Sequence, residues 1–257
     1  MYDSSKLLPK SQFQQLLRLL PTPRQKKRGR KRNSKEALLA GILQVLVNGV
    51  AWRKIADCGA SYASCFRYVQ ELQRRGKLKL IFQRLAWEKT DLTVGSIDTT
   101  LISSFAFRYL TGFNGQHRQT GTKVSLFADK DGLPADVQFG KGNVNDKAFL
   151  LAHLKNTAGK RKKILNLDMS YMSLSFRRAM RQKGIRVNMK VREQDFRRKR
   201  GPKFKLDEQI YNMRMFVERT NAWVKAFRAL RLRRSAHPAM FKAFVYLVLI
   251  IVLTRHS

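Results

Sequence analysis

The chain has 257 residues, and 53 lysines and arginines against only 17 aspartates and glutamates leave a net charge of +36. With 44% hydrophobic residues, the composition is that of a folded protein and excludes a disordered tail. A surface this positive repels itself unless a polyanion neutralises it, so a nucleic acid is the expected partner. An anionic membrane is the competing polyanion, and ribosomal proteins are a class of similar charge.

Cysteine content and apolar runs indicate the compartment. Cys58 and Cys65 are the only cysteines, too few for a disulfide framework or a four-thiolate zinc site. No signal-peptide pattern opens the chain, so we expect a cytoplasmic protein. The run 243–253 is wholly apolar, but it is shorter than the roughly 20 residues that cross a bilayer. It predicts a buried C-terminal helix and no membrane partner.

The first part of the chain, to about residue 89, has apolar residues at helical spacing and is predicted to be helical throughout. Ser34 predicts a helix start, and Gly59 with Ser61 separates two helices in the way of a helix-turn-helix. Between the first two predicted helices, seven of the nine residues 24–32 are basic. This basic arm is either a solvated linker or a segment that follows nucleic-acid phosphates. Its candidate contact residues are Lys27, Arg28, Arg30, Lys31 and Arg32.

The pattern changes after residue 90. Short apolar segments bounded by turn residues predict five strands, over 93–98, 123–129, 134–140, 163–168 and 185–191. Helical spacing predicts a helix over 145–157 with Asn145 or Asp146 as its cap, and one over 171–184 closed by Gly184. A last helix follows the fifth strand. This order of elements predicts an α/β fold.

Three carboxylates accompany the elements of this predicted sheet. Asp98 ends the first strand, Asp168 ends the fourth, and Glu218 lies on the helix after the fifth. Strand ends and a following helix converge at one edge of a mixed sheet. Clustered carboxylates repel each other unless cations lie between them, and oxygen ligands favour hard cations such as Mg²⁺. Two such ions about 4 Å apart activate a water or a 3′-hydroxyl for displacement at phosphorus. The sequence therefore predicts cutting or joining of a nucleic-acid backbone.

The helix that carries Glu218 gathers cationic and phenolic side chains. Tyr211, Arg214, Glu218 and Lys225 fall within about 60° of helix circumference and share one face. A phenol, a guanidinium, a carboxylate and an ammonium make a platform for a DNA strand. The alternative is that Arg214 and Glu218 form only a solvated salt bridge with a spacing of four residues.

These four residues, separated by two, three and six positions, resemble the Y-R-E-K signature of bacterial insertion-sequence transposases of the DDE type. The segments GSIDTTLI and LDMSY resemble the two aspartate motifs of that family, and VERTNAW resembles its glutamate motif. KDGLPADVQFGKGNVNDKAFL resembles the region between the aspartates, and GILQVLVNGVAWRKIA resembles the N-terminal helical region. The resemblance covers nearly the whole chain and is to a small subgroup without a large insertion.

The resemblance implies an RNase H-like mixed sheet flanked by helices over residues 91–257 and a small all-helical DNA-binding domain over 1–90. It implies that Asp98, Asp168 and Glu218 are catalytic ligands of two Mg²⁺ ions, which Mn²⁺ could replace. Tyr211, Arg214 and Lys225 are then expected to contact the backbone of the transposon end. The implied partners are the inverted-repeat ends, target DNA and a second copy of the chain in a homodimer, at the nucleoid in the bacterial cytoplasm.

Further basic residues extend the expected DNA surface. The segment 192–205 is either a solvated loop or a strand contact beside the cleft. Residues 228–234 are expected to continue the glutamate helix as a basic face. The candidate contacts in and around these segments are Arg197, Arg198, Lys199, Arg200, Arg219, Arg228, Arg231, Arg233 and Arg234.

Other residues have structural interpretations. Trp223 lies roughly 140° around the helix from Glu218 and is expected to pack into the core, with stacking on an unpaired base as the minority reading. His117 is expected to lie at the surface or to contact DNA, and not to act in catalysis. Residues Asp129, Asp131 and Asp136 are interpreted as turn chemistry. The segment 100–110 has more aromatic residues than the family resemblance leads us to expect.

The function implied is that of a DNA transposase, which binds inverted repeats, cleaves a strand with two metal ions and transfers the 3′-hydroxyl to target DNA. One alternative is a non-catalytic nucleic-acid-binding protein derived from a transposase. Another is an RNase H-like nuclease without strand transfer.

Overall fold

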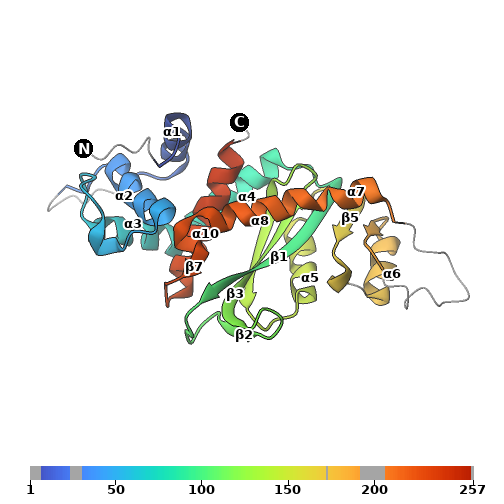
Figure 1. Cartoon of the computed structure of the whole chain (residues 1–257). Coiled ribbons are helices and arrows are strands. Elements are labelled where there is room, and N and C mark those ends of the chain that lie inside the picture. The colour runs from blue at the N-terminus through green and yellow to red at the C-terminus, as the bar shows by residue number, and fades with distance from the viewer. Residues whose placement is uncertain (1–6, 24–30, 172, 192–205, 256–257) are drawn as a thin grey trace, which may run out of the picture. The chain divides into compact units, whose positions relative to one another are not determined.

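The computed structural model describes residues 7–23, 31–171, 173–191 and 206–255 (Figure 1). The chain divides into two units. The helical unit comprises Met1–Leu85, Ile102–Leu110 and Trp223–Ser257, and the sheet unit comprises Ala86–Leu101 and Thr111–Ala222. Both the N-terminal and the C-terminal helices therefore belong to the helical unit. The assignment of DNA binding to residues 1–90 and catalysis to 91–257 stays a prediction.

The N-terminal part is helical, as predicted, with α1 (Lys10–Leu19), α2 (Lys35–Asn48), α3 (Tyr62–Arg74) and α4 (Lys77–Lys89). Ser34 begins α2 because its Oγ accepts a hydrogen bond from the backbone N–H of Ala37 at 3.1 Å. Gly49 ends α2 in the left-handed conformation. The predicted helical run after Ser61 is divided at Gly76, whose φ is +65°.

The connection between α2 and α3 differs from the expected helix-turn-helix. Residues 49–61 separate the two helices and include the short 3-10 helix η2 (Trp52–Lys54), whereas a helix-turn-helix has a turn of about three or four residues. Gly59 does adopt a left-handed conformation before the Ser61 cap, with φ of +79°. The turn at Gly59 lies where the sequence predicts it, but α2 ends earlier because Gly49 caps it.

The apolar C-terminal run forms α10 (Pro238–Arg255), which supplies much of the core of the helical unit. It packs against α1 and α3. Among the described residues, this is the one helix long and apolar enough to cross a membrane, and 78% of its 18-residue apolar window is buried within the protein. The prediction of a buried C-terminal helix is confirmed.

The sheet has seven strands in the described chain: β1 (Val94–Ser104), β2 (Gly112–Asn114), β3 (Gln119–Asp129), β4 (Pro134–Lys141), β5 (Ile164–Leu167), β6 (Arg186–Asn188) and β7 (Leu232–Arg233). The strand order is β2-β3-β1-β5-β6, with β4 beside β3 and β7 beside the end of β1. Strands β3 and β4 are antiparallel, while β1, β5 and β6 are parallel. The sheet is therefore mixed, as predicted.

Helices α5 (Lys147–Asn156) and α6 (Leu174–Gln182) flank this sheet (Figure 1). Leu150 of α5 and Met180 of α6 are buried against Ile97, Leu165 and other apolar residues of the strands. Of the two expected caps of α5, Asp146 is wrong, since its side chain forms no cap hydrogen bond, whereas Asn145 Oδ1 accepts from the backbone N–H of Lys147 at 3.0 Å. Asp146 is instead held by an ion pair with the Lys123 ammonium at 2.7 Å.

Two helices begin the last described segment of the chain, and the second of them carries Glu218. Helix α7 (Glu208–Asn212) is followed after Met213 by α8 (Arg214–Ala226). Gly132, in the turn between β3 and β4, lies against α8: its φ is +86°, and a Cβ added there would lie 2.8 Å from the carbonyl oxygen of Phe216. The Thr220 hydroxyl of α8 donates a hydrogen bond to the Gly132 carbonyl at 2.7 Å. This turn therefore holds the helix that carries Glu218.

We predict that Gly132→Ala lowers the free energy of unfolding by about 1–3 kcal/mol, because the new methyl group both strains the backbone and collides with α8. Urea denaturation measures the change. Gly115→Ala is the matched control, since an added Cβ there meets nothing within 4 Å and the backbone is not left-handed. Equal stability of the two variants would contradict the proposed contact.

Candidate active site

The parallel pairing of β1 and β5 sets the position of both candidate aspartates. Ile97 pairs with Leu167 in the last step of this ladder, so Asp98 and Asp168 each come one residue beyond the paired segment, on neighbouring strands. Asp168 follows its strand as predicted. The prediction that Asp98 ends its strand is wrong, because β1 continues to Ser104, where it pairs with β7.

One guanidinium connects the three predicted acids. Arg214, at the start of α8, donates from Nη1 to Asp168 Oδ1 at 3.0 Å, and from Nη2 to Glu218 Oε1 at 3.2 Å and Asp98 Oδ1 at 3.5 Å. Its Nη1 also lies 3.3 Å from the Tyr211 hydroxyl of α7. Arg214 is only 7% exposed. The structure thus brings Asp98, Asp168 and Glu218 together around a buried positive charge.

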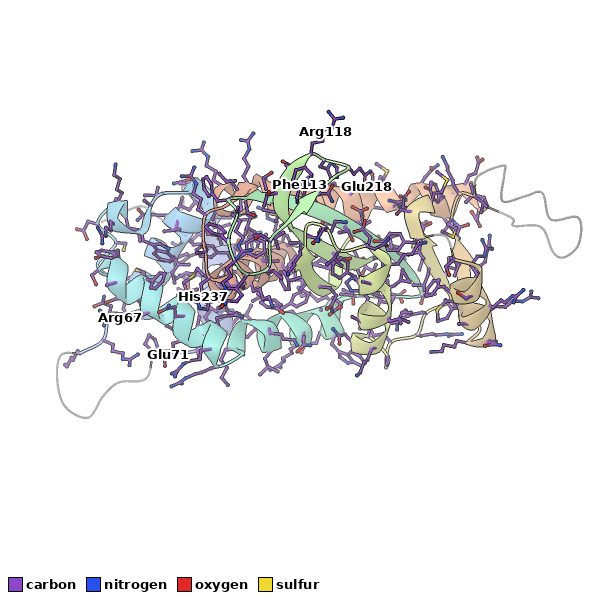
Figure 2. All side chains as sticks on the ribbon, turned by 90° about the horizontal axis from the view of Figure 1, so that it is seen from below. Arg67, Glu71, Phe113, Arg118, Glu218 and His237 are labelled. Atoms are coloured by element: carbon purple, nitrogen blue, oxygen red, sulfur yellow. The ribbon has the colours of Figure 1, made fainter. Side chains whose placement is uncertain are left out.

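Access to the three carboxylates is graded. Side-chain exposure rises from 23% at Asp98 through 44% at Asp168 to 56% at Glu218. Figure 2 shows Glu218 on α8 from below. The site therefore opens to solvent on the side of Glu218 and closes towards Asp98.

The two aspartates have different electrostatic environments. Burial raises the pKa of Asp98, against the opposing effects of the Arg214 charge and a hydrogen bond from Asn221. Burial also raises the pKa of Asp168, but the hydrogen bond and the charge of Arg214 outweigh it, so this pKa is lowered. Asp168 is the more firmly ionised of the pair, and Asp98 is the more costly to keep charged without a cation.

Asn221 is a site residue that the sequence analysis missed. Its Nδ2 donates to Asp98 Oδ2 at 2.7 Å, and the residue is 3% exposed. Its Oδ1 and the Nε of Arg214 are buried without a hydrogen-bond partner among the described residues. The available signal was its position three residues after Glu218, which places both on one side of a helix.

A pair of buried asparagines attaches α7 to the sheet. Asn166 of β5 donates to the carbonyl of Ile210 at 2.6 Å. Asn188 of β6 donates to the carbonyl of Asp207 at 2.9 Å and accepts from its backbone N–H at the same distance. These contacts fix the segment that leads into Tyr211 and Arg214. Sequence reasoning missed them because asparagines in short strands carry no distinctive spacing.

A second buried network runs beneath the site. The Tyr171 and Thr99 hydroxyls lie 3.0 Å apart, and Thr99 donates to Ser125 Oγ at 2.9 Å. Ser125 lies 3.0 Å from His153 Nε2, and His153 Nδ1 lies 2.7 Å from Asp136 Oδ2. The interpretation of Asp136 as a turn residue is wrong, because it lies in β4 and ends this series of hydrogen bonds. The series begins at Tyr171 and Thr99, which are close in sequence to Asp168 and Asp98.

The predicted DNA-contact residues fall into several places. Lys225 and Arg219 are exposed on α8, with the Arg219 guanidinium 4.9 Å from the Phe216 ring centroid. Arg228 is exposed in α9 (Arg228–Arg231), where its stem packs near Gly49. Trp223 is half-buried and so is not the fully buried core residue that was expected, whereas His117 is exposed, as expected. The remaining contacts in the basic segments lie outside the described residues: Lys27, Arg28, Arg30, Arg197, Arg198, Lys199 and Arg200.

The expected basic face over residues 228–234 is wrong in two respects. The glutamate helix ends at Ala226, and a separate short helix and strand follow it. Arg231 and Arg234 are exposed, but Arg233 is fully buried and its guanidinium bonds to backbone carbonyls. Arg233 therefore shapes the protein and does not face DNA.

A cavity of about 860 Å³ in the helical unit is lined by part of the basic arm. Lys31, Arg32 and Arg67 lie along it with Ser61 and Glu71. Figure 2 labels Arg67 and Glu71 at this place. Arg32 pairs with Glu71 at 3.1 Å, so a phosphate that binds Arg32 has to compete with this carboxylate.

Comparison with known proteins agrees with this architecture. Residues 89–253 match the family model described as "Transposase DDE domain", and residues 8–82 match "Putative transposase of IS4/5 family". A putative transposase for insertion sequence element IS402 from Burkholderia cepacia is 29% identical over 147 residues, covering 53% of this chain and 65% of the relative. The matched part is thus less than two thirds of that relative's length.

A cryo-EM structure of the piggyBac transposase synaptic complex with hairpin DNA has the same fold. It aligns with 98% of this chain and 72% of its own, with a TM-score of 0.59 and 11% identity. The α/β prediction is confirmed. Because the DDE model matches well over half of its residues, this chain belongs to the DDE transposase family of insertion sequences.

Proposed function

We propose that this chain binds the inverted-repeat ends of its insertion sequence, cleaves one strand there and joins the freed 3′-hydroxyl to target DNA. The observation that carries the proposal is the convergence of Asp98, Asp168 and Glu218 on the single guanidinium of Arg214. A protein with a charge of +36 that gathers three acids around one guanidinium is suited to cation-assisted chemistry on a polyanion.

The donor set of this site fits divalent cations in its chemistry. Three carboxylates and one guanidinium sum to a charge of −2, and the Asn221 Oδ1 without a partner is a further oxygen donor. As the side chains lie, no three acids, histidines or cysteines in the described part of the chain are arranged to hold a metal. We infer that Arg214 takes the place of the metals and moves aside when Mg²⁺ or Mn²⁺ binds.

Bound Mg²⁺ supplies an activated water or 3′-hydroxyl and neutralises charge that develops at phosphorus. The chain's own residues orient these parts. Asn221 fixes Asp98, and the asparagines below α7 fix the segment that carries Tyr211. The Tyr211 ring has Lys190 Nζ at 5.0 Å and the Arg214 guanidinium at 5.5 Å from its centroid, a cationic surround suited to a phosphate.

Exposed cations on α8 extend this surface in the proposal. Lys225 and Arg219 hold the backbone of the transposon end, and Lys31 with Arg32 contributes to end recognition from the helical unit. Pairing two ends requires a second copy of the chain, so the active form is a homodimer. Its place of action is the nucleoid, where the target DNA lies.

We predict that Asp98→Asn, Asp168→Asn and Glu218→Gln each abolish Mg²⁺-dependent cleavage of a duplex with the element's end, while binding of that duplex persists. Each substitution removes a charge that the metals require, yet keeps the side-chain shape. A gel assay of strand cleavage measures the loss. Asp131→Asn, in the exposed β3–β4 turn, is the control that keeps activity. Full activity in any of the three variants would remove that residue from the site.

Lys225→Ala is expected to weaken end binding and to reduce the slope of log affinity against log salt by about 1, as for one lost phosphate contact. Fluorescence anisotropy across a salt titration measures both quantities. Lys155→Ala, an exposed lysine in the last turn of α5, is the control. An unchanged slope for Lys225→Ala would exclude this lysine from the contact surface.

Arg214→Ala tests the inferred exchange between guanidinium and metal without measuring activity. In the variant without metal, the three carboxylates lose their shared cation, and we expect the free energy of unfolding to fall by about 2 kcal/mol. The loss is no larger because two of the acids are half exposed and are screened by water. Added Mn²⁺ should restore more stability to this variant than it adds to the unsubstituted chain. Arg219→Ala is the control. A Mn²⁺ response equal in the variant and the unsubstituted chain would contradict the exchange.

A further inference from the structure

The loop that follows β1, Phe105 to Leu110, has a shape imposed by a buried arginine. Arg233 is fully buried, and its guanidinium donates to the carbonyls of Leu110 at 3.2 Å, Tyr109 at 3.1 Å and Ala236 at 3.0 Å. Its Nε donates to the carbonyl of Ser235 at 3.0 Å. Leu110 is held at φ +60°, a conformation that non-glycine residues rarely adopt. These bonds fix the loop without any help from a ligand.

One aromatic ring of the loop serves this structure. The Arg233 guanidinium lies between Phe107 and Phe241, 5.4 Å and 5.3 Å from the two ring centroids. Phe107 is thereby part of the packing. The other two rings lie largely in solvent: Phe105, which is edge-on to Phe107 at 6.1 Å between ring centroids, is 58% exposed, and Tyr109 is 55% exposed. A rigid loop that leaves two large rings in solvent is built for contact with something else.

The charged residues of the two chain segments that carry and hold these rings are all basic. The Arg108 guanidinium lies 5.3 Å from the centroid of the Tyr109 ring. Strand β7 pairs in parallel with Ser103 and Ser104 of β1, so exposed Arg234 follows β7 where Phe105 follows β1. The segments 102–110 and 223–257, which supply this part of the helical unit, contain no aspartate or glutamate.

This combination selects the chemistry of the ligand. Cations without acids require an anionic partner, and exposed rings favour flat apolar faces. Unpaired nucleotides offer both, because their bases are free to stack and their phosphates are charged, whereas a duplex hides its base faces. A second copy of this chain is a poor partner for the patch, since it carries the same net charge of +36.

We propose that Phe105 and Tyr109, flanked by Arg108 and Arg234, form a stacking patch for unpaired nucleotides of DNA. The proposal rests on the proposed function in one respect, because strand cleavage is the step that yields unpaired nucleotides at a DNA end. The loop continues directly from β1, the strand that carries Asp98.

The test compares two DNA probes of the same duplex, one blunt and one with a short thymidine overhang, in EDTA so that no cleavage occurs. Fluorescence anisotropy should give tighter binding of the overhang probe by the unsubstituted chain. Phe105→Ala and Tyr109→Ala should each reduce this preference on the order of 5- to 100-fold, as for one lost stacked base, and leave blunt-duplex affinity unchanged. Tyr109→Phe keeps the ring and should keep the preference.

Phe113→Ala is the matched control, because Phe113 on β2 is 61% exposed but lies outside the loop (Figure 2). Quenching of 2-aminopurine in the overhang gives a second readout, which should be lost with Tyr109→Ala and retained with Tyr109→Phe. If one alanine variant does not fold, as judged by circular dichroism, the other variant and the unsubstituted chain decide the result.

The proposal would be overturned by equal affinity of the unsubstituted chain for both probes, by an undiminished preference in both alanine variants, or by an equal loss in Phe113→Ala. Dissociation of a dimer by Phe105→Ala with the preference intact would also overturn it, in favour of a subunit interface. Failure to bind either probe would count against the proposed function itself, whereas duplex binding without preference would count against the stacking patch alone.

Discussion

The guanidinium of Arg214 is the contact on which the candidate active site depends. Three carboxylates from β1, the end of β5 and α8 would repel one another at these distances, and a single buried cation allows them to share one place. The site keeps a net negative charge, because one positive charge faces three negative ones. That imbalance is the physical reason why a cation of higher charge is expected to compete for the same position.

Two buried polar networks hold the strands and helices whose acidic side chains Arg214 connects. Asn166 and Asn188 fasten α7 to the strands, so the break before α8 occurs where Arg214 reaches both aspartates. In the series of hydrogen bonds from Tyr171 to Asp136, each hydroxyl can donate to the next group along, and His153 connects the last hydroxyl to the Asp136 carboxylate. Polar networks of this kind are costly when incomplete, so they favour one arrangement of the strands over its alternatives.

Much of this was predictable from sequence, for identifiable reasons. Period and turn residues located the strands and helices, and Ser34 and Gly184 marked helix ends that the structure has. The pairing of β1 with β5 places Asp98 beside Asp168, which follows its strand as predicted. The extension of β1 past Asp98 was not predictable, because it depends on pairing with β7, a two-residue strand far along the chain. The prediction that Arg233 contacts DNA is wrong for a similar reason, because only tertiary packing distinguishes this buried arginine from the exposed Arg234 beside it. Asn221 and His153 lacked a recognisable spacing to a partner.

Charge is distributed so that the few acids mark functional or structural positions. Asp136 and Asp146 are each paired within the sheet unit, and Asp98, Asp168 and Glu218 meet at Arg214.

The central claim is that these three acids form one cation site in which Arg214 is a substitute. A crystal structure with Mn²⁺ and the element's end DNA tests it most directly, by anomalous scattering. The account predicts Mn²⁺ between Asp98, Asp168 and Glu218, with the Arg214 guanidinium displaced from them. Mn²⁺ bound elsewhere, with Arg214 still bridging all three acids, would contradict it.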